Sequence, residues 1–438
     1  MKLSKGARLW TYAKSIIPGG NQILSKRPER FLPFHWPSYY ERASGCKLWD
    51  LDGKEYFDFA QMGVGSCVLG YADPDVNRAV IRCIKKGSMS SLNCKEEVLL
   101  TKELIKLHPW AKMARYTRSG GEACAVAIRI ARAATGRSNI VFCGYHGWHD
   151  WYLSANISNK ENLSDQLLPG LKPSGVPCQL AKTAIPFHFN NIIELQKIFR
   201  KYKNEIAAVI IEPARSFLPK KNFLMEVKKE AKKNGALLIF DEITSGFRVC
   251  NGGLHLKLNI NPDLCILGKA LGNGFPISAV IGTKQAMENA QNSFISSTFW
   301  SERIGFTAAL ATIKKFKEEK ADRKLISYGR SIKHGIENIG RRTGLKVTVE
   351  GIEPLLKIKF HAGRPNEYQT FYAGEMLKNG FLVGGNIYTS LAYNDRIIKN
   401  FLIQSEKVFL QISKVIKSKK PLIKNKKNII SQDFKRLN

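Results

Sequence analysis

Residues 236–282 read ALLIFDEITSGFRVCNGGLHLKLNINPDLCILGKALGNGFPISAVIG, and they contain three short apolar runs. The runs cover residues 236–240, 264–267 and 278–281, and each is bounded by glycine, proline or charged residues. Short apolar runs with such boundaries are typical of strands that are buried on both faces. We therefore predict three strands of an α/β sheet in this stretch.

Charged residues stand at the ends of two of these runs. Asp241 closes the first run, and Lys269 follows the second after a single glycine. A charge at the end of a buried strand is costly unless it meets a partner or a ligand, and open α/β sheets bind ligands at this edge. Pyridoxal phosphate needs an amine for a Schiff base and a carboxylate for its ring nitrogen. The pair predicts a pyridoxal phosphate site.

A second stretch, RYTRSGGEACAVAIRIARAAT at 115–135, predicts a short strand followed by a helix. Ser119, Gly120 and Gly121 lie between the two elements. Two glycines let the backbone approach an anion, and the first turn of a helix presents free N–H groups. The pattern therefore indicates a phosphate site, although it is also typical of a tight turn with a helix cap.

The stretch IVFCGYHGWHDWY at 140–152 predicts a strand and a turn that carries aromatic residues. An aromatic side chain just past a strand end, such as Tyr145, can lie flat on a conjugated ring. His146, His149 and Asp150 could instead suggest a metal site. No further ligands of suitable spacing are found, so we favour stacking and hydrogen bonding and predict no metal.

Further strand and helix patterns support the prediction of an α/β fold. Residues 207–217, AAVIIEPARSF, predict a buried strand that ends in Glu212. Strands and helices alternate from residue 115 to residue 282, which indicates a mostly parallel sheet with right-handed crossovers. Residues 154–182 are polar and aperiodic, so we expect a long surface loop there.

The whole chain of 438 residues is long enough for two cores. Residues 47–59 predict a hairpin around Asp52–Gly53. Residues 311–345 predict a long helical stretch. Residues 413–427 predict an exposed, partly disordered basic tail. We expect four parts: an arm and strand pair at 1–55, a large domain at 56–310, a small domain at 311–412 and a tail at 413–438.

Composition narrows the function classes. The formal net charge is +33, which could favour binding to nucleic acid or to an anionic membrane. No basic stripe carries interleaved aromatics, so we favour a surface of solvated lysines, with no nucleic acid and no membrane as partners. Nine cysteines without C-x-x-C spacing indicate reduced thiols and a cytoplasmic location. No signal peptide or membrane span is predicted.

The runs DEITSGFR at 241–248 and LGKALGNGFP at 267–276 resemble the aspartate and lysine motifs of class III (subgroup II) aminotransferases of fold type I. Glutamate-1-semialdehyde aminomutase and its relatives are the most similar members, and the resemblance covers residues 15–410. It implies a fold type I pyridoxal phosphate enzyme with a seven-stranded, mostly parallel sheet and a smaller α+β C-terminal domain. It also implies a homodimer.

The resemblance assigns roles to particular residues. Lys269 is expected to form the Schiff base and to carry the substrate proton, and Asp241 to hold the ring nitrogen. Tyr145 is expected to stack on the ring, with Ile243 on the opposite face. The remaining cofactor contacts are expected from Ser119, Gly120, Gly121, His146, Glu212 and, across the subunit interface, Thr298. Arg27 and Arg215 are candidates for a substrate anion, although ion pairs explain either residue as well.

The resemblance leaves the reaction open between a transaminase and an aminomutase. Phe217 stands where the aminomutases are expected to have Asn, and Phe299–Trp300 departs from their pattern. We therefore favour transfer between two molecules, with a keto sugar or a keto acid as the acceptor. Two other classes of protein are possible. A cofactor-binding protein without catalysis would lack Lys269, which is present. A protein that binds its partner through charge would show steep salt dependence of binding.

Overall fold

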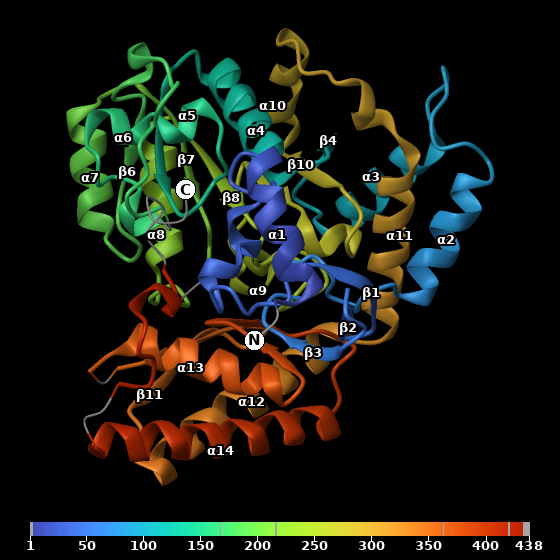
Figure 1. The fold of residues 1–438 in the computed structure, drawn as a ribbon. Helices are drawn as coiled ribbons and strands as arrows, with labels where there is room; N and C mark the ends of the chain where they lie inside the picture. Colours follow the sequence, from blue (N-terminus) through green and yellow to red (C-terminus); the bar gives the residue numbers. More distant parts are fainter. Residues whose placement is uncertain (1–2, 167, 215–216, 362, 419–420, 432–438) are drawn as a thin grey trace. The chain divides into compact units, whose positions relative to one another are not determined.

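The computed structural model describes residues 3–166, 168–214, 217–361, 363–418 and 421–431 (Figure 1). The chain divides into two compact units. One unit comprises residues 74–322, and the other combines residues 1–73 with residues 323–438. The four-part division expected from the sequence stays a prediction.

A seven-stranded sheet forms the centre of the unit at 74–322, with strand order β4-β10-β9-β8-β7-β5-β6 (Figure 1). β10 runs antiparallel to both of its neighbours, and the strands from β9 to β6 are parallel to one another. The mostly parallel sheet that we predicted is confirmed. Its strands are β4 (Met113–Thr117), β5 (Asn139–Cys143), β6 (Ala184–Pro186), β7 (Ile206–Ile211), β8 (Leu237–Asp241), β9 (Leu264–Leu267) and β10 (Ser278–Gly282).

The helices of this unit follow from local sequence signals. α4 begins at a capping box in which the Ser119 hydroxyl and the Glu122 carboxylate each accept from the other residue's backbone N–H. It ends at Gly136 in the left-handed region, and its apolar face packs across β7 to β10. The helices are α2 (Pro74–Ile84), α3 (Lys95–Leu107), α4 (Gly120–Thr135), α5 (Asp150–Leu153), α6 (Ala155–Ser158), α7 (Ile192–Lys201), α8 (Phe223–Lys233), α9 (Leu254–Leu258), α10 (Lys284–Met287) and α11 (Arg303–Glu318).

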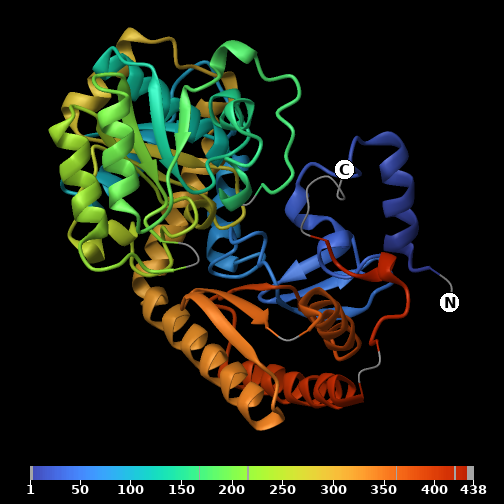
Figure 2. The ribbon, with the colours of Figure 1, turned by 90° about the vertical axis from the view of Figure 1, so that its left-hand side faces the viewer.

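The other unit is built on two smaller sheets (Figure 2). Residues 47–59 form the predicted hairpin, and β13 from the C-terminal segment adds to it in parallel beside β3. The first sheet contains β1 (Tyr40–Ser44), β2 (Lys47–Asp50), β3 (Glu55–Phe59) and β13 (Phe381–Val383), and the second contains β11 (Val347–Ile352), β12 (Leu355–Phe360) and β14 (Asn386–Tyr388). Its helices are α1 (Lys5–Ile16), α13 (Pro365–Lys378), α14 (Asp395–Ser418) and α12 (Ala321–Thr343), whose first turn spans the boundary between the units.

Three segments differ from the sequence prediction. The helical stretch at 311–345 is interrupted, because Lys320 takes a left-handed φ of 49° between α11 and α12. The predicted loop at 154–182 contains α6 and two 3-10 turns, and it buries Leu163 and Leu171.

The segment predicted as an exposed basic tail begins as the last turns of α14, which ends at Ser418. Beyond this helix, the N–H groups of Leu422 and Ile423 donate to the Glu367 carboxylate. Ile430 is buried and donates to the Thr370 hydroxyl. The backbone of Leu422 and Ile423 is therefore anchored on α13, whereas residues 424–427 are exposed, as the sequence predicts.

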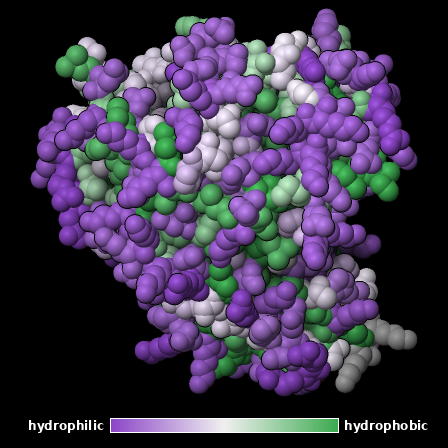
Figure 3. Space-filling model, turned by 180° about the vertical axis from the view of Figure 1, so that it is seen from behind, coloured by the Kyte–Doolittle hydropathy of each residue, from purple (hydrophilic) through white to green (hydrophobic). Residues whose placement is uncertain are grey.

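The hydropathy of the protein surface can be followed on one face of the molecule. The face drawn in Figure 3 is mostly hydrophilic, with apolar residues gathered in smaller patches. Among the described residues, no helix is both long enough and apolar enough to cross a membrane.

Candidate active site

Five strands that run in the same direction, β4, β5, β7, β8 and β9, end at the same edge of the seven-stranded sheet, and a predicted site residue follows or closes each of them. β8 ends at Asp241, which pairs with Ile266 of β9, three residues before Lys269. Ser119, Tyr145 and Glu212 follow β4, β5 and β7. Open α/β sheets bind their ligands at this edge, so the topology gathers residues that are up to 150 positions apart.

The Asp241 carboxylate is almost fully occupied by donors from the protein. It is 2% exposed. Its Oδ2 accepts from His146 Nδ1 at 2.8 Å and from the Cys124 thiol at 3.5 Å. Its Oδ1 accepts from the Ile243 N–H at 3.1 Å. Because an ionised carboxylate offers about four acceptor positions, one position on Oδ1 is left for a further donor.

Lys269 lies on a strained turn directly after Gly268. Its φ is 45°, in the left-handed region that residues with a Cβ rarely adopt. Strain of this kind persists where the surrounding structure fixes it, and it is found mainly at functional sites. The Nζ donates to Thr244 Oγ1 at 2.9 Å, and Thr244 belongs to the same turn as Asp241. The lysine amine is therefore held beside the segment that follows β8.

The start of α4 provides an anion site close to this segment. The N–H groups in the first turn of a helix have no intrahelical acceptor, and those of Gly120 and Gly121 belong to this turn. A Cβ added at Gly120 would lie 2.8 Å from Ile243, and one added at Gly121 would lie 3.1 Å from His149. The two glycines therefore allow this close approach without displacing either side chain.

The turn after β5 brings Tyr145 and His146 to the site. The Tyr145 N–H donates to the Glu212 carboxylate at 2.9 Å, which fixes the backbone of the aromatic residue. His146 is fully buried, and because a carboxylate only accepts, its Nδ1 carries the hydrogen that binds Asp241. His149 instead stacks on Trp148, with ring centroids 4.6 Å apart.

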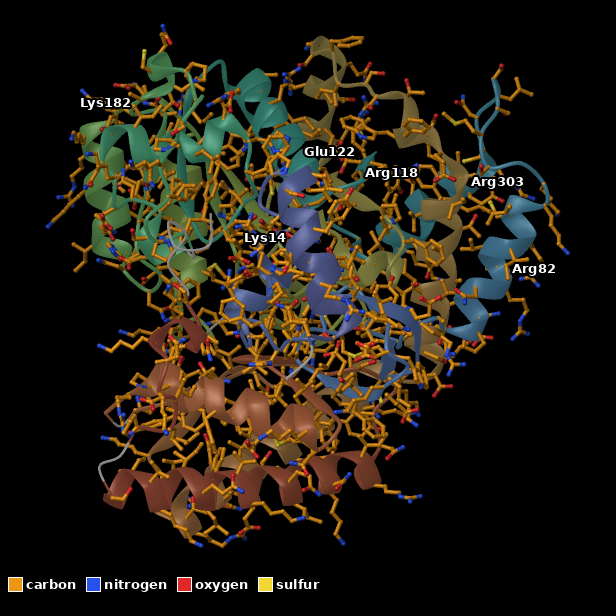
Figure 4. All side chains as sticks on the ribbon, viewed as in Figure 1. Lys14, Arg82, Arg118, Glu122, Lys182 and Arg303 are labelled. Atoms are coloured by element: carbon orange, nitrogen blue, oxygen red, sulfur yellow. The ribbon has the colours of Figure 1, made fainter. Side chains whose placement is uncertain are left out.

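Thr298 opens a 3-10 turn, η7 (Thr298–Ser301), and is exposed to solvent. Arg118 holds this turn through the carbonyl oxygens of Phe299 at 2.7 Å, Trp300 at 3.1 Å and Glu302. Glu122 accepts from the Arg118 and Ser119 N–H groups, so the anion site and the Thr298 turn share one network. Figure 4 shows Arg118 and Glu122 side by side at the start of α4.

Several residues of this site were missed by sequence reasoning. Cys124 and Arg118 act through contacts with residues more than 100 positions away, and no local pattern signals such contacts. Thr244 could have been found, because it lies three residues after Asp241 in the quoted motif. Of the substrate-anion candidates, Arg27 belongs to the other unit, and Arg215 lies outside the described residues.

The residues present fit pyridoxal phosphate. The open position on Asp241 Oδ1 can accept from a protonated ring nitrogen, and the first turn of α4 can receive a phosphate. An amine suited to a Schiff base lies at the same edge of the sheet. The ligand atoms of Cys124, His146 and Asp241 also lie within 4.8 Å of one another, a spacing that could hold a metal ion. The hydrogen bonds of Asp241 to His146 and Cys124 also account for this grouping.

Comparisons with known proteins agree with this chemistry. The profile of the family described as Aminotransferase class-III matches residues 33–385. The 3-aminobutyryl-CoA aminotransferase of Cloacimonas acidaminovorans is 31% identical over 93% of this chain and 99% of its own length. The glutamate-1-semialdehyde 2,1-aminomutase of Methanosphaera stadtmanae is 31% identical over 89% of this chain and 93% of its own.

A solved structure resembles the whole chain. The FumI protein of Sphingopyxis sp. MTA144, in its PLP internal aldimine form, superposes with a TM-score of 0.86 at 26% identity. The superposition covers 95% of this chain and 98% of that one.

Proposed function

The chain belongs to the class-III aminotransferases, and we propose that it is a transaminase that moves an amino group from a donor to a carbonyl group of a separate acceptor molecule. Its cofactor is pyridoxal phosphate, which when bound supplies a reactive carbonyl and a ring that withdraws electrons. The observation that carries the residue assignment is Asp241, a buried carboxylate with three donors from the protein and one acceptor position left.

Each residue of the site takes a distinct part in this proposal. Asp241 Oδ1 keeps a proton on the ring nitrogen, because an ionised partner at hydrogen-bond distance favours the charged form. Lys269 Nζ would hold the cofactor covalently and, once the substrate amine has displaced it, the freed amine would carry the proton between the substrate carbon and the cofactor. Tyr145 and Ile243 cover the two ring faces. Ser119, Gly120 and Gly121 bind the phosphate, and His146 and Glu212 fix Asp241 and Tyr145.

We also propose that the enzyme is a homodimer in which Thr298 contacts the cofactor phosphate of the partner subunit. The support is the surface around this residue. Phe294 is 85% exposed and Phe299 is 68% exposed, and both flank Thr298. Two large apolar side chains this exposed within six residues favour an interaction surface here. All nine cysteines are free thiols, which supports the cytoplasm as the location.

The nature of the acceptor is inferred from Phe217 and from the segment 154–175. Phe217 is 54% exposed, so it offers an apolar surface where the aminomutases are expected to have an amide. The segment 154–175 carries short helical turns, with few of the glycines expected of a loop that closes over a reactive intermediate. Both features favour transfer between two molecules, with a keto sugar or a keto acid as acceptor.

The test supplies glutamate-1-semialdehyde alone, with no second donor or acceptor. We expect no sustained formation of 5-aminolevulinate. We also expect amino transfer from glutamate, or another donor in a panel, to a separate keto acid, keto sugar or 3-ketoacyl thioester. Sustained formation of 5-aminolevulinate would show an aminomutase and reject the proposal.

A further inference from the structure

Cys124 lies inside α4 and contacts Asp241, yet neither the motif nor the proposed chemistry gives it a part. Its side chain is fully buried, and its Sγ lies 3.5 Å from Asp241 Oδ2. Burial and the neighbouring Asp241 carboxylate raise the pKa of this thiol well above its usual value. The thiol therefore keeps its hydrogen, and it acts as a donor to the carboxylate.

The donor is placed on one particular oxygen. Cys124 and His146 both bind Oδ2, whereas only the Ile243 N–H binds Oδ1. A carboxylate oxygen has two lone pairs, so the protein closes Oδ2 and leaves Oδ1 half open. Without the thiol, Oδ2 would keep an open position as well, and the carboxylate could turn either oxygen to the ring nitrogen.

The strength of the donor also matters. A thiol is a weak hydrogen-bond donor, and a hydroxyl at the same position is a stronger one. A strong donor would draw negative charge toward Oδ2, and less charge would then remain to hold a proton on the ring nitrogen. The weak thiol occupies the second acceptor position of Oδ2 and withdraws little negative charge from Oδ1.

We propose that Cys124 is a positioning residue for the cofactor ring: its thiol closes Asp241 Oδ2, directs Oδ1 to the ring nitrogen and leaves Oδ1 its charge. The proposal rests on the assignment of Asp241 to the ring nitrogen in the proposed function. It assigns Cys124 no contact with the substrate and no covalent step.

The test compares Cys124→Ser and Cys124→Ala with the native enzyme. Cys265→Ser is the matched control, because Cys265 is equally buried on β9, and its thiol lies 3.9 Å from His255 Nδ1 with no hydrogen bond to Asp241. The ring nitrogen of the bound cofactor is labelled with ¹⁵N, and its chemical shift reports protonation. Cofactor dissociation constants are measured alongside, with a chelator present to remove any metal ion.

The proposal predicts an order set by donor strength. Cys124→Ser moves the ¹⁵N shift toward the unprotonated ring and weakens cofactor binding roughly three- to tenfold, the range of one net hydrogen bond. Cys124→Ala leaves the ring protonated but also weakens cofactor binding, because the carboxylate can then turn either oxygen to the ring nitrogen. Cys265→Ser matches the native enzyme in both measurements. Equal shifts in all four proteins would overturn the proposal. A native enzyme with an unprotonated ring would instead reject the assignment of Asp241.

Discussion

At the scale of single residues, the site depends on how the protein prepares one carboxylate. Buried charges are costly, and Asp241 is stabilised by donors from α4, from the turn after β5 and from its own turn. These donors leave a single acceptor position, so the carboxylate is oriented before any ligand arrives. Orientation in advance of binding is what gives electrostatic groups their large effect at a dry site.

We predict that Asp241→Asn folds and binds the cofactor but loses about 10²–10³ in turnover, because an amide cannot hold the ring proton as a carboxylate does. Asp263→Asn is the control, since Asp263 lies just before β9 and accepts from the Leu238 N–H. Circular dichroism confirms folding, and single-turnover kinetics give the loss. Near-normal turnover of Asp241→Asn would mean that another acid holds the ring.

Sequence reasoning reaches some of these residues and misses others for a physical reason. Asp241 and Lys269 could be predicted because a buried apolar run that ends in a charge is a local pattern. Cys124 could not, because it reads as one more apolar position of an amphipathic helix, and its contact with Asp241 spans 117 positions. Roles that depend on a contact across the fold have no local signal.

At the scale of elements, a second buried network lies on the other side of the β8 end. Glu242 accepts from the N–H of His255 at 2.9 Å, from its Nδ1 at 2.7 Å and from the Ser245 hydroxyl at 2.8 Å. His255 Nε2 accepts from Trp110, and His108 Nε2 accepts from the Gly253 N–H. The network joins the end of α3 to the start of α9, and so it fixes the segment that follows Asp241.

This network predicts a loss of stability in mild acid. Burial lowers the pKa of His108 from 6.5 to about 4. Between pH 6.5 and pH 4, this histidine therefore binds a proton more readily in the unfolded chain than in the folded protein. The contribution of neutral His108 to folding stability is complete above about pH 6.5 and falls as the pH drops toward 4. Between about pH 7 and pH 5 we expect a loss of about 2 kcal/mol from this residue.

Urea unfolding of the native protein and of His108→Gln at several pH values measures this effect. The variant has no titrating ring, so its stability should fall less steeply over the same interval. Glu242 does not interfere, because its pKa is lowered by the His255 hydrogen bond against the effect of burial, and its contribution is lost only below about pH 4.5. Parallel curves for the two proteins would exclude His108 as the cause.

At the scale of the whole molecule, one of the two units combines segments from both ends of the sequence, residues 1–73 and 323–438. The N-terminal hairpin was predictable from the Asp52–Gly53 turn, but its pairing with β13 was not, because more than 300 residues separate β3 from β13. The break between α11 and α12 was also missed, since helical periodicity continues through Lys320. Local sequence patterns indicate single helices and strands, whereas packing in the folded chain decides which distant strands pair.

The homodimer gives a prediction at this scale. Phe299→Lys should weaken self-association at least tenfold, because a charge placed in an apolar interface loses its hydration. Ile403→Lys on α14 is the control, a similar change at another exposed apolar position. Sedimentation equilibrium measures both variants. A native protein that sediments as an active monomer would reject the dimer and the role of Thr298 with it.

The proposed chemistry depends above all on Lys269, which we propose holds the cofactor beside Asp241. The most direct measurement is to reduce the cofactor-loaded enzyme with borohydride, digest it and locate the modified lysine by mass spectrometry. We predict a single label on Lys269 and none in Lys269→Ala, which should still bind the cofactor without turnover. A label on Lys257 or Lys284, or a label that persists in Lys269→Ala, would contradict the assignment of Lys269.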